Sequence, residues 1–180
     1  MKKLFFFFAL PLLLVSCKGV EQYKAGIEEL ATNWDQTTTA ITDFSGMVSS
    51  DLTKYTQTLA GMQLDEMAAA KLKPEQTAAL DEAKMAVVNA LGGYPVLQKN
   101  IQEFVSTWTD KSAAVTALKD GFAAGKIEGD VPAQISELSG LVTTANENLA
   151  SWKGTYDTIK GGVETAMGSL NELLGSFAAN

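Results

Sequence analysis

The chain has a single cysteine, Cys17, and it has neither histidine nor arginine. A thiolate is a strong nucleophile, so Cys17 is the residue with the most distinctive chemistry. The missing histidines remove the usual general base and the commonest metal ligand. The missing arginines remove the bidentate clamp for phosphate and carboxylate groups. One cysteine forms neither an intramolecular disulfide nor a zinc site with several thiolates, so its sequence neighbours decide what its thiol does.

A charged and then apolar segment precedes Cys17. Met1-Lys2-Lys3 leads into an uncharged apolar run, residues 4–15. This run is shorter than the roughly 20 apolar residues that cross a bilayer, and its length is typical of a signal peptide. The run ends in Leu14-Val15-Ser16-Cys17, which resembles the lipobox of bacterial lipoproteins. The resemblance covers only the leader. It implies recognition of the three residues before Cys17 by the signal peptidase, cleavage after Ser16, a diacylglycerol on the Cys17 thiol and acylation of the new amine.

The sequence therefore predicts residues 1–16 as a lipoprotein signal peptide and residues 17–21 as a lipidated N-terminus with a short tether. Cleavage removes two lysines and no acidic residue, which changes the net charge from −7 to −9. Anionic headgroups repel such a surface, so the lipid chains must hold the protein on the membrane. In bacteria with two membranes, an aspartate after the lipidated cysteine resembles an inner-membrane retention signal. This chain has Lys18 there, which favours the outer membrane; the sequence leaves open whether the domain faces the periplasm or the exterior.

Composition and motifs argue against several classes of function. The acidic chain has no basic run, which argues against nucleic-acid binding. Gly121 and Gly125-Lys126-Ile127 superficially resemble a phosphate-binding loop. Such a loop has four residues between its glycines and a serine or threonine after the lysine, whereas this segment has three residues and an isoleucine. We interpret it as a helix end. We expect no catalytic residues, no metal and no cofactor, and therefore no enzyme.

Apolar residues recur at alternating steps of three and four, which is typical of helices that pack side by side. The first series runs from Tyr23 to Met62 and predicts one helix of about 40 residues, with Gly46 as a place to bend. Residues 63–73 are predicted to form a connection with a helical turn. Pro74 suits the first position of the next helix, because its missing N–H has no partner there.

The rest of the chain predicts two further helical segments. Gly92-Gly93-Tyr94-Pro95 interrupts the helix that starts at Pro74, and a third apolar series follows from Leu97 to Phe122. Residues 125–130 form a predicted turn, with Asp130 as the N-cap of the last helix. That helix carries the most regular repeat, which predicts a core side made of Ile135, Leu138, Val142, Ala145, Leu149, Trp152, Tyr156, Ile159, Val163, Ala166, Leu170, Leu173 and Phe177.

These segments predict an all-α fold in which residues 22–180 form one helical bundle domain. We expect an elongated antiparallel helical bundle with coiled-coil-like packing and three long helices, the middle one broken at Gly92-Gly93. The alternative is a four-helix bundle in which the middle segment folds back at these glycines. Each long segment carries one tryptophan, and a shared aromatic layer is the simplest interpretation.

Five glycines of the last predicted helix are spaced by multiples of seven. We call them the glycine row: Gly140, Gly154, Gly161, Gly168 and Gly175. With Leu149, Tyr156 and Val163 on the core side, the row lies on the opposite side of the helix. Each exposed glycine costs a helix about 1 kcal/mol relative to alanine. Either the helix tolerates this loss, or the row lets another helix, chain or flat surface approach the backbone closely, as a candidate interaction stripe.

Two classes of function remain open. In the first, the chain is a membrane-anchored envelope lipoprotein whose domain is a non-catalytic structural or protein-interaction module, associating with copies of itself or with an envelope protein. In the second, the bundle is a carrier or sensor of a lipid or other apolar ligand, with Gly92-Gly93 as a hinge. The absence of catalytic residue types and the long heptads favour the first.

Overall fold

The structure is a computed structural model that describes residues 18–178. The predicted signal peptide and the residues Leu14, Val15, Ser16 and Cys17 lie outside the described residues. Directly after them, Lys18–Glu21 form a single helical turn, α1, within the segment predicted as a tether.

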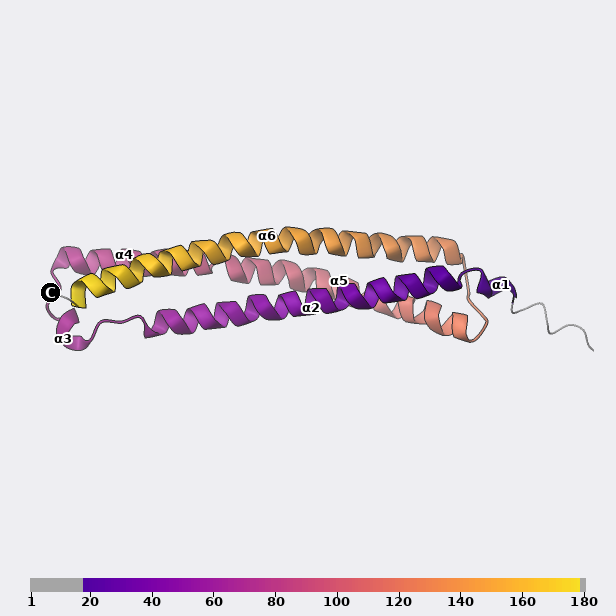
Figure 1. Cartoon of the computed structure of the whole chain (residues 1–180), viewed down its shortest axis with the longest axis horizontal. Helices are drawn as coiled ribbons and strands as arrows, with labels where there is room; N and C mark the ends of the chain where they lie inside the picture. The colour runs from indigo at the N-terminus through magenta and orange to yellow at the C-terminus, as the bar shows by residue number, and fades with distance from the viewer. Residues whose placement is uncertain (1–17, 179–180) are drawn as a thin grey trace, which may run out of the picture. The chain divides into compact units, whose positions relative to one another are not determined.

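The described part of the chain is helical, with no strands, and three long helices account for most of it (Figure 1). The first is α2, Lys24–Gly61, which is uninterrupted at Gly46. The second consists of α4, Pro74–Leu91, and α5, Gly93–Ala123, which follow one another without folding back. The third is α6, Val131–Ala178. The helices pack antiparallel, which confirms the three-helix prediction, and the four-helix alternative is wrong.

The middle helix bends where Gly92 separates α4 from α5. Gly92 keeps a right-handed helical conformation, with φ −58° and ψ −19°, so the chain continues in nearly the same direction. Pro95 lies in the first turn of α5 and has no N–H to donate to the carbonyl of Leu91 four residues earlier. The missing hydrogen bond and the proline ring explain a bend rather than a reversal.

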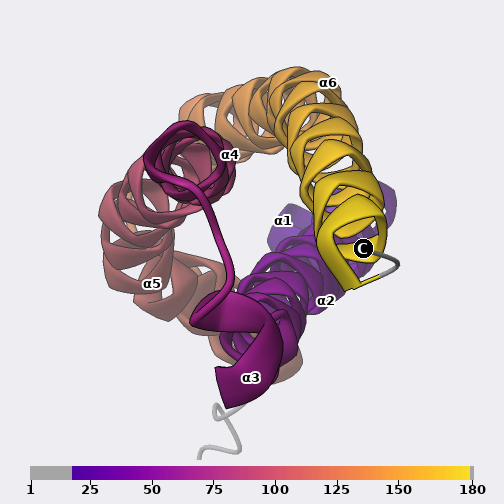
Figure 2. The ribbon, with the colours of Figure 1, turned by 90° about the vertical axis from the view of Figure 1, so that its left-hand side faces the viewer.

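The chain divides into two compact units, and each contains a stretch of all three long helices. Within the described residues, unit 1 comprises residues 18–36 and 108–143, and unit 2 comprises residues 37–107 and 144–178. In unit 2, a turn of helix, α3 (Glu66–Ala69), lies between α2 and α4, near the end of α6 (Figure 2). Asp65 caps α3 by accepting a hydrogen bond from the backbone of Ala68.

Local signals place the turn between α5 and α6 in unit 1. Gly125 has φ +68°, and the Lys126 N–H donates to the carbonyl of Gly121 at 2.8 Å, which is the Schellman arrangement that ends many helices. The Asp130 side chain accepts a 3.1 Å hydrogen bond from the Ala133 N–H, so the predicted N-cap of α6 is confirmed. The segment that superficially resembled a phosphate-binding loop is a helix end.

Most of the predicted apolar series is buried, and the later turns of α6 show a systematic correction. In the first half of α6 the predicted core residues Leu138, Val142, Leu149 and Trp152 are buried. After Val163, Met167 and Leu174 are buried, whereas the predicted Ala166 and Leu173 are only half-buried. A straight helix with 3.6 residues per turn drifts about 20° per heptad relative to a strict seven-residue repeat. The drift moves the buried side of α6 by one position over its length.

Candidate functional site

The glycine row lies on the exposed side of α6, as its heptad position predicts. All five glycines are exposed, and a Cβ built at any of them would meet no atom within 4 Å apart from the neighbouring backbone of its own helix. Gly140 belongs to unit 1, and the other four belong to unit 2. The backbone there is open to an approaching surface, so the row is a candidate contact surface.

A second cluster, which the sequence analysis missed, joins α2 to α6 inside unit 2. The buried Tyr156 of α6 donates a 2.5 Å hydrogen bond to Asp51 of α2. The buried Tyr55 of α2 donates a 2.8 Å hydrogen bond to Glu164 of α6. Each helix therefore supplies one phenol and one carboxylate, and the two bonds are reciprocal. Hydrogen bonds from a hydroxyl to a carboxylate are among the stronger ones in proteins. We call this arrangement the tyrosine latch.

Tyr94 of α5 lies between the two rings of the tyrosine latch. Its ring centroid is 6.2 Å from that of Tyr55 and 6.2 Å from that of Tyr156. The side chain is fully buried, and its hydroxyl has no hydrogen-bond partner among the described residues. A buried hydroxyl without a partner costs free energy, because it has lost its bonds to water. The packing of its ring therefore holds Tyr94 in place.

Burial keeps all three tyrosines protonated. Burial away from water raises the pKa of Tyr94 to about 12, because it disfavours the charged phenolate. The negative charges of Asp51 and Glu164 raise it further. For Tyr55 and Tyr156, burial and then the hydrogen bond to the carboxylate raise the pKa well above the usual 10.0. A phenol with a raised pKa is a poor base and a poor nucleophile near neutral pH. The cluster can therefore donate hydrogen bonds, and its arrangement suits helix pairing better than catalysis.

The sequence does contain a weak signal for this cluster. Tyr55 and Tyr156 occupy core positions in their heptads, and Asp51 lies four residues before Tyr55 on the same side of α2. A tyrosine in a core needs a partner for its hydroxyl, so a carboxylate beside the core is a candidate. Which carboxylate on the other helix pairs with each tyrosine depends on the register between the two helices. The apolar spacing within one helix carries no information about that register.

The tryptophans divide between the units. In unit 1, Trp34 of α2 stacks on Trp108 of α5 with ring centroids 3.6 Å apart, and Trp34 Nε1 donates to Ser112 Oγ at 3.2 Å. In unit 2, Trp152 packs edge-on against Phe104, at 5.5 Å between centroids. Both stacked rings are buried, which agrees with a packing role.

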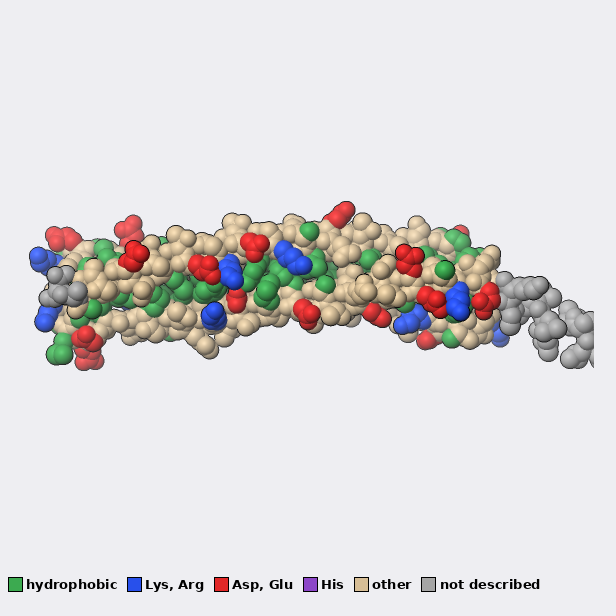
Figure 3. All heavy atoms as spheres, viewed as in Figure 1, with side chains coloured by type: hydrophobic (Ala, Val, Ile, Leu, Met, Phe, Trp, Pro, Cys, Tyr) green, Lys and Arg blue, Asp and Glu red, His purple; other side chains and the backbone are tan. Residues whose placement is uncertain are grey.

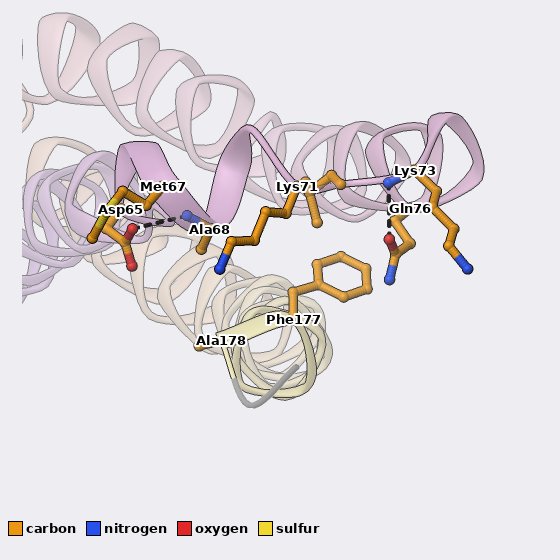
Figure 4. Close-up of a pocket in the computed structure, with 9 residues that line it drawn as sticks. Asp65, Met67, Ala68, Lys71, Lys73, Gln76, Phe177 and Ala178 are labelled. Atoms are coloured by element: carbon orange, nitrogen blue, oxygen red, sulfur yellow. Dashed lines mark hydrogen bonds between the residues drawn. The ribbon is translucent and has the colours of Figure 1, made fainter.

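A hollow of about 560 Å³ lies at one end of unit 2 (Figure 4). It is lined by α3, the start of α4 and the end of α6, and Phe177 and Lys71 lie across it from one another. Met67, which also lines it, is 76% exposed. The volume falls in the range of small-molecule sites, roughly 300–1,000 Å³, but the lining is only partly apolar.

The charged side chains of the described residues form no metal-binding group. On the face seen in Figure 3, acidic and basic side chains are scattered rather than gathered. Within residues 18–178, no group of three or more acidic or thiol side chains is placed to hold a metal ion. None of the helices in this part combines the length and the apolar character that crossing a membrane requires.

The comparisons with known proteins give no match. No protein-family model, no curated protein and no solved structure matches the chain. Support for a function therefore comes from the sequence and from the geometry of the candidate sites.

Proposed function

We propose that this chain is a lipoprotein of the bacterial cell envelope and that its domain is a non-catalytic module for structural or protein interactions. One observation carries the anchoring: a charged and apolar leader ends in Leu14-Val15-Ser16-Cys17, which places the only thiol of the chain at the one position a lipobox requires. Lipid on Cys17 tethers the domain, and Lys18 directs it to the outer membrane.

Two features support a role without catalysis. The chain has no histidine or arginine, and the buried tyrosines of unit 2 are protonated hydrogen-bond donors near neutral pH. The long helices bury their apolar sides against one another, which leaves polar and small residues for contacts with other molecules.

The anchoring is tested by labelling with a radioactive fatty acid in a bacterium with two membranes. We expect label in the full chain, no label in Cys17→Ser, and unchanged label in Ser16→Ala, which keeps the residue before the cysteine small. Label that persists in Cys17→Ser would refute the lipoprotein assignment. Fractionation of the same cells places the protein in the inner or the outer membrane.

The glycine row is the proposed contact surface for a second copy or an envelope protein. Leucine at Gly161 and Gly168 fills the space above the backbone, where no described atom lies within 4 Å of a built Cβ. We expect these changes to abolish association through the row while circular dichroism shows full helicity. Association as tight as that of the unchanged chain would refute a contact through the row.

The hollow in unit 2 supports a second candidate, a carrier of an apolar ligand. Figure 3 shows hydrophobic side chains along the seam between α2 and α6, and Phe177 lies within the hollow. Titration with a fluorescent anilinonaphthalene sulfonate tests this candidate. A carrier predicts one saturable site that Phe177→Ala weakens and that Met47→Ala, on an exposed part of α2, leaves intact. Binding that is weak and unsaturable argues for the interaction module.

A further inference from the structure

Exposed apolar side chains concentrate on one part of the middle helix in unit 2. Among the described residues, five large hydrophobic side chains are exposed, and three of them lie on α4 and the start of α5. Met85 is 62% exposed, Val88 is 55% exposed and Val96 is 61% exposed. Single exposed hydrophobic residues are normal on a protein surface, whereas a concentration of them points to a contact.

These side chains share one side of the helix. At 100° per residue, the positions of Met85, Val88, Gly92 and Val96 fall within an arc of about 80°. The arc continues across the bend because Gly92 keeps a right-handed helical conformation. Gly92 is exposed and has no side chain, so another helix can approach the backbone there. Residues 85–98 contain no charge. We call these four residues the α4–α5 face.

The charges at the two ends of the α4–α5 face are opposite and symmetric. Asp81 and Lys99 are both exposed and lie on the same side of the helix, at equal sequence distances from Ala90. Consider a twofold axis perpendicular to the helix, at the level of Ala90 along its length. This axis places Asp81 of one copy opposite Lys99 of the other at both ends. The same axis places Val88 of one copy opposite Gly92 of the other, a side chain against a gap. A parallel pairing of the two faces would instead bring like charges together.

We propose that the α4–α5 face is the contact surface of an antiparallel twofold dimer of this chain. Under a twofold axis, the charges and the shape of this face are complementary to those of the same face on another copy. This self-complementarity favours a second copy of the chain as the partner. A membrane surface would favour a rim of lysines alone, whereas Lys84 and Lys99 share the rim with the acidic Asp81, Glu82 and Glu103. Lys99 also pairs with Glu103 of its own helix at 3.8 Å. Both side chains are mostly exposed, so this ion pair competes only weakly with the contact between Lys99 and Asp81 of the second copy.

The dimer is expected to be weak and concentration-dependent. One side of a single helix buries less than the roughly 1,200 Å² that stable protein–protein interfaces need. The dimer contact involves neither lipid at Cys17 nor the glycine row, so an experiment can refute it without refuting the proposed function.

A charge exchange between two copies tests the proposed pairing. The full chain is studied by sedimentation equilibrium in a density-matched detergent at low salt. Asp81→Lys and Lys99→Asp each place like charges at both ends of their own homodimer, and we expect dimerisation about tenfold weaker for each. A mixture of the two variants restores both opposite-charge pairs, so the heterodimer should form as tightly as the unchanged homodimer. Equal weakening in the mixture would overturn the antiparallel pairing.

A matched pair of substitutions tests the apolar part of the face. Val88→Lys places a charge at the centre of the contact and should leave only monomer. Met47→Lys changes a hydrophobic side chain of α2 that is 41% exposed, and it should leave the dimer intact. Circular dichroism verifies that both variants keep their helicity. A chain that is monomeric at every concentration, or a dimer that persists in Val88→Lys, overturns the proposal. Vesicle binding that Val88→Lys abolishes, in a chain that is always monomeric, would overturn it in favour of a membrane contact.

Discussion

Tyr156 on α6 donates its phenolic hydrogen to Asp51 on α2 at 2.5 Å, and this bond is one half of the tyrosine latch. The other half runs in the opposite sense, from Tyr55 on α2 to Glu164 on α6. Both bonds lie in unit 2, and both join helices that are far apart in the sequence. The latch therefore fixes the register of α2 against α6, a task that apolar packing alone performs less specifically.

Removing a hydroxyl from the tyrosine latch should destabilise the protein. Tyr156→Phe leaves the ring in place but removes the donor to Asp51, and we expect the free energy of unfolding to fall by about 1.5–3 kcal/mol, as for other hydrogen bonds to charged groups. Urea unfolding followed by circular dichroism measures the change. Tyr94→Phe is the matched control, because its hydroxyl is buried without a described partner. That variant should be neutral or more stable; a loss as large as that of Tyr156→Phe would show that the Tyr94 hydroxyl has a partner.

Alkaline pH should destabilise unit 2 through its buried tyrosines. The folded state raises the pKa of Tyr94 from 10.0 to about 12, and burial raises those of Tyr55 and Tyr156 as well. The stability that comes from keeping these phenols neutral is fully present below pH 10. It is lost above pH 10, where the unfolded chain releases protons that the folded chain retains.

The expected size of this effect is about 1.4 kcal/mol per pH unit for each tyrosine between pH 10 and its folded pKa. Urea midpoints at pH 9, 10 and 11 measure it. The comparison with Tyr94→Phe isolates the contribution of this tyrosine from that of the other groups in the chain. The dependence on pH should be shallower in that variant, and identical slopes would contradict the raised pKa of Tyr94.

Alanine in the glycine row should stabilise the domain. At Gly161 and Gly168 a Cβ meets nothing within 4 Å, so alanine gains helix propensity without a clash. We expect each change to raise the free energy of unfolding by about 1 kcal/mol if water covers the row. Differential scanning calorimetry on dilute protein measures the shift. An unchanged or lower melting temperature would indicate that another surface already covers the row.

Alanine at Gly93, where α5 and α6 approach closely, should have the opposite effect. A Cβ at Gly93 would lie 2.7 Å from Cγ1 of Ile159, which is β-branched and stiff, so α5 or α6 must move to accommodate it. Gly93→Ala should lower the free energy of unfolding by about 1–3 kcal/mol. The double variant Gly93→Ala with Ile159→Ala removes all three side-chain carbons near the built Cβ, so its loss should be smaller than the sum of the losses of the two single variants. A loss equal to that sum would place the strain elsewhere.

Lys18→Asp should move the protein between membranes if the leader is that of a lipoprotein. The change places an aspartate after the predicted lipidated cysteine, which resembles an inner-membrane retention signal. Density-gradient separation of the two membranes should show the unchanged chain in the outer membrane and the variant in the inner membrane. Lys18→Gln is the control for loss of charge alone, and it should stay with the unchanged chain.

The sequence was sufficient for the helices because their signals are local. The three-and-four spacing predicted the long helices, and Pro74 and Asp130 marked two helix starts that the structure confirms. Two features of the structure could not be predicted from the spacing of apolar residues within single helices. The partner of Tyr156 follows from the register between α2 and α6, and the burial of Met167 follows from drift accumulated along α6. The exposed side of α4 and α5 was also missed, because the core periodicity describes only the buried side.

The division of aromatic residues between the units makes them separate optical probes. The stacked Trp34 and Trp108 both belong to unit 1, so Trp152→Phe restricts indole fluorescence to that unit. Tyr23 belongs to unit 1, so Tyr23→Phe leaves phenols only in unit 2, and at pH 11 their ionisation on unfolding is followed in the ultraviolet. One sample of the double variant therefore reports on each unit separately during unfolding. Coincident transitions would show that helices shared by both units couple them into one cooperative block, and separated transitions would show that each melts as its own block.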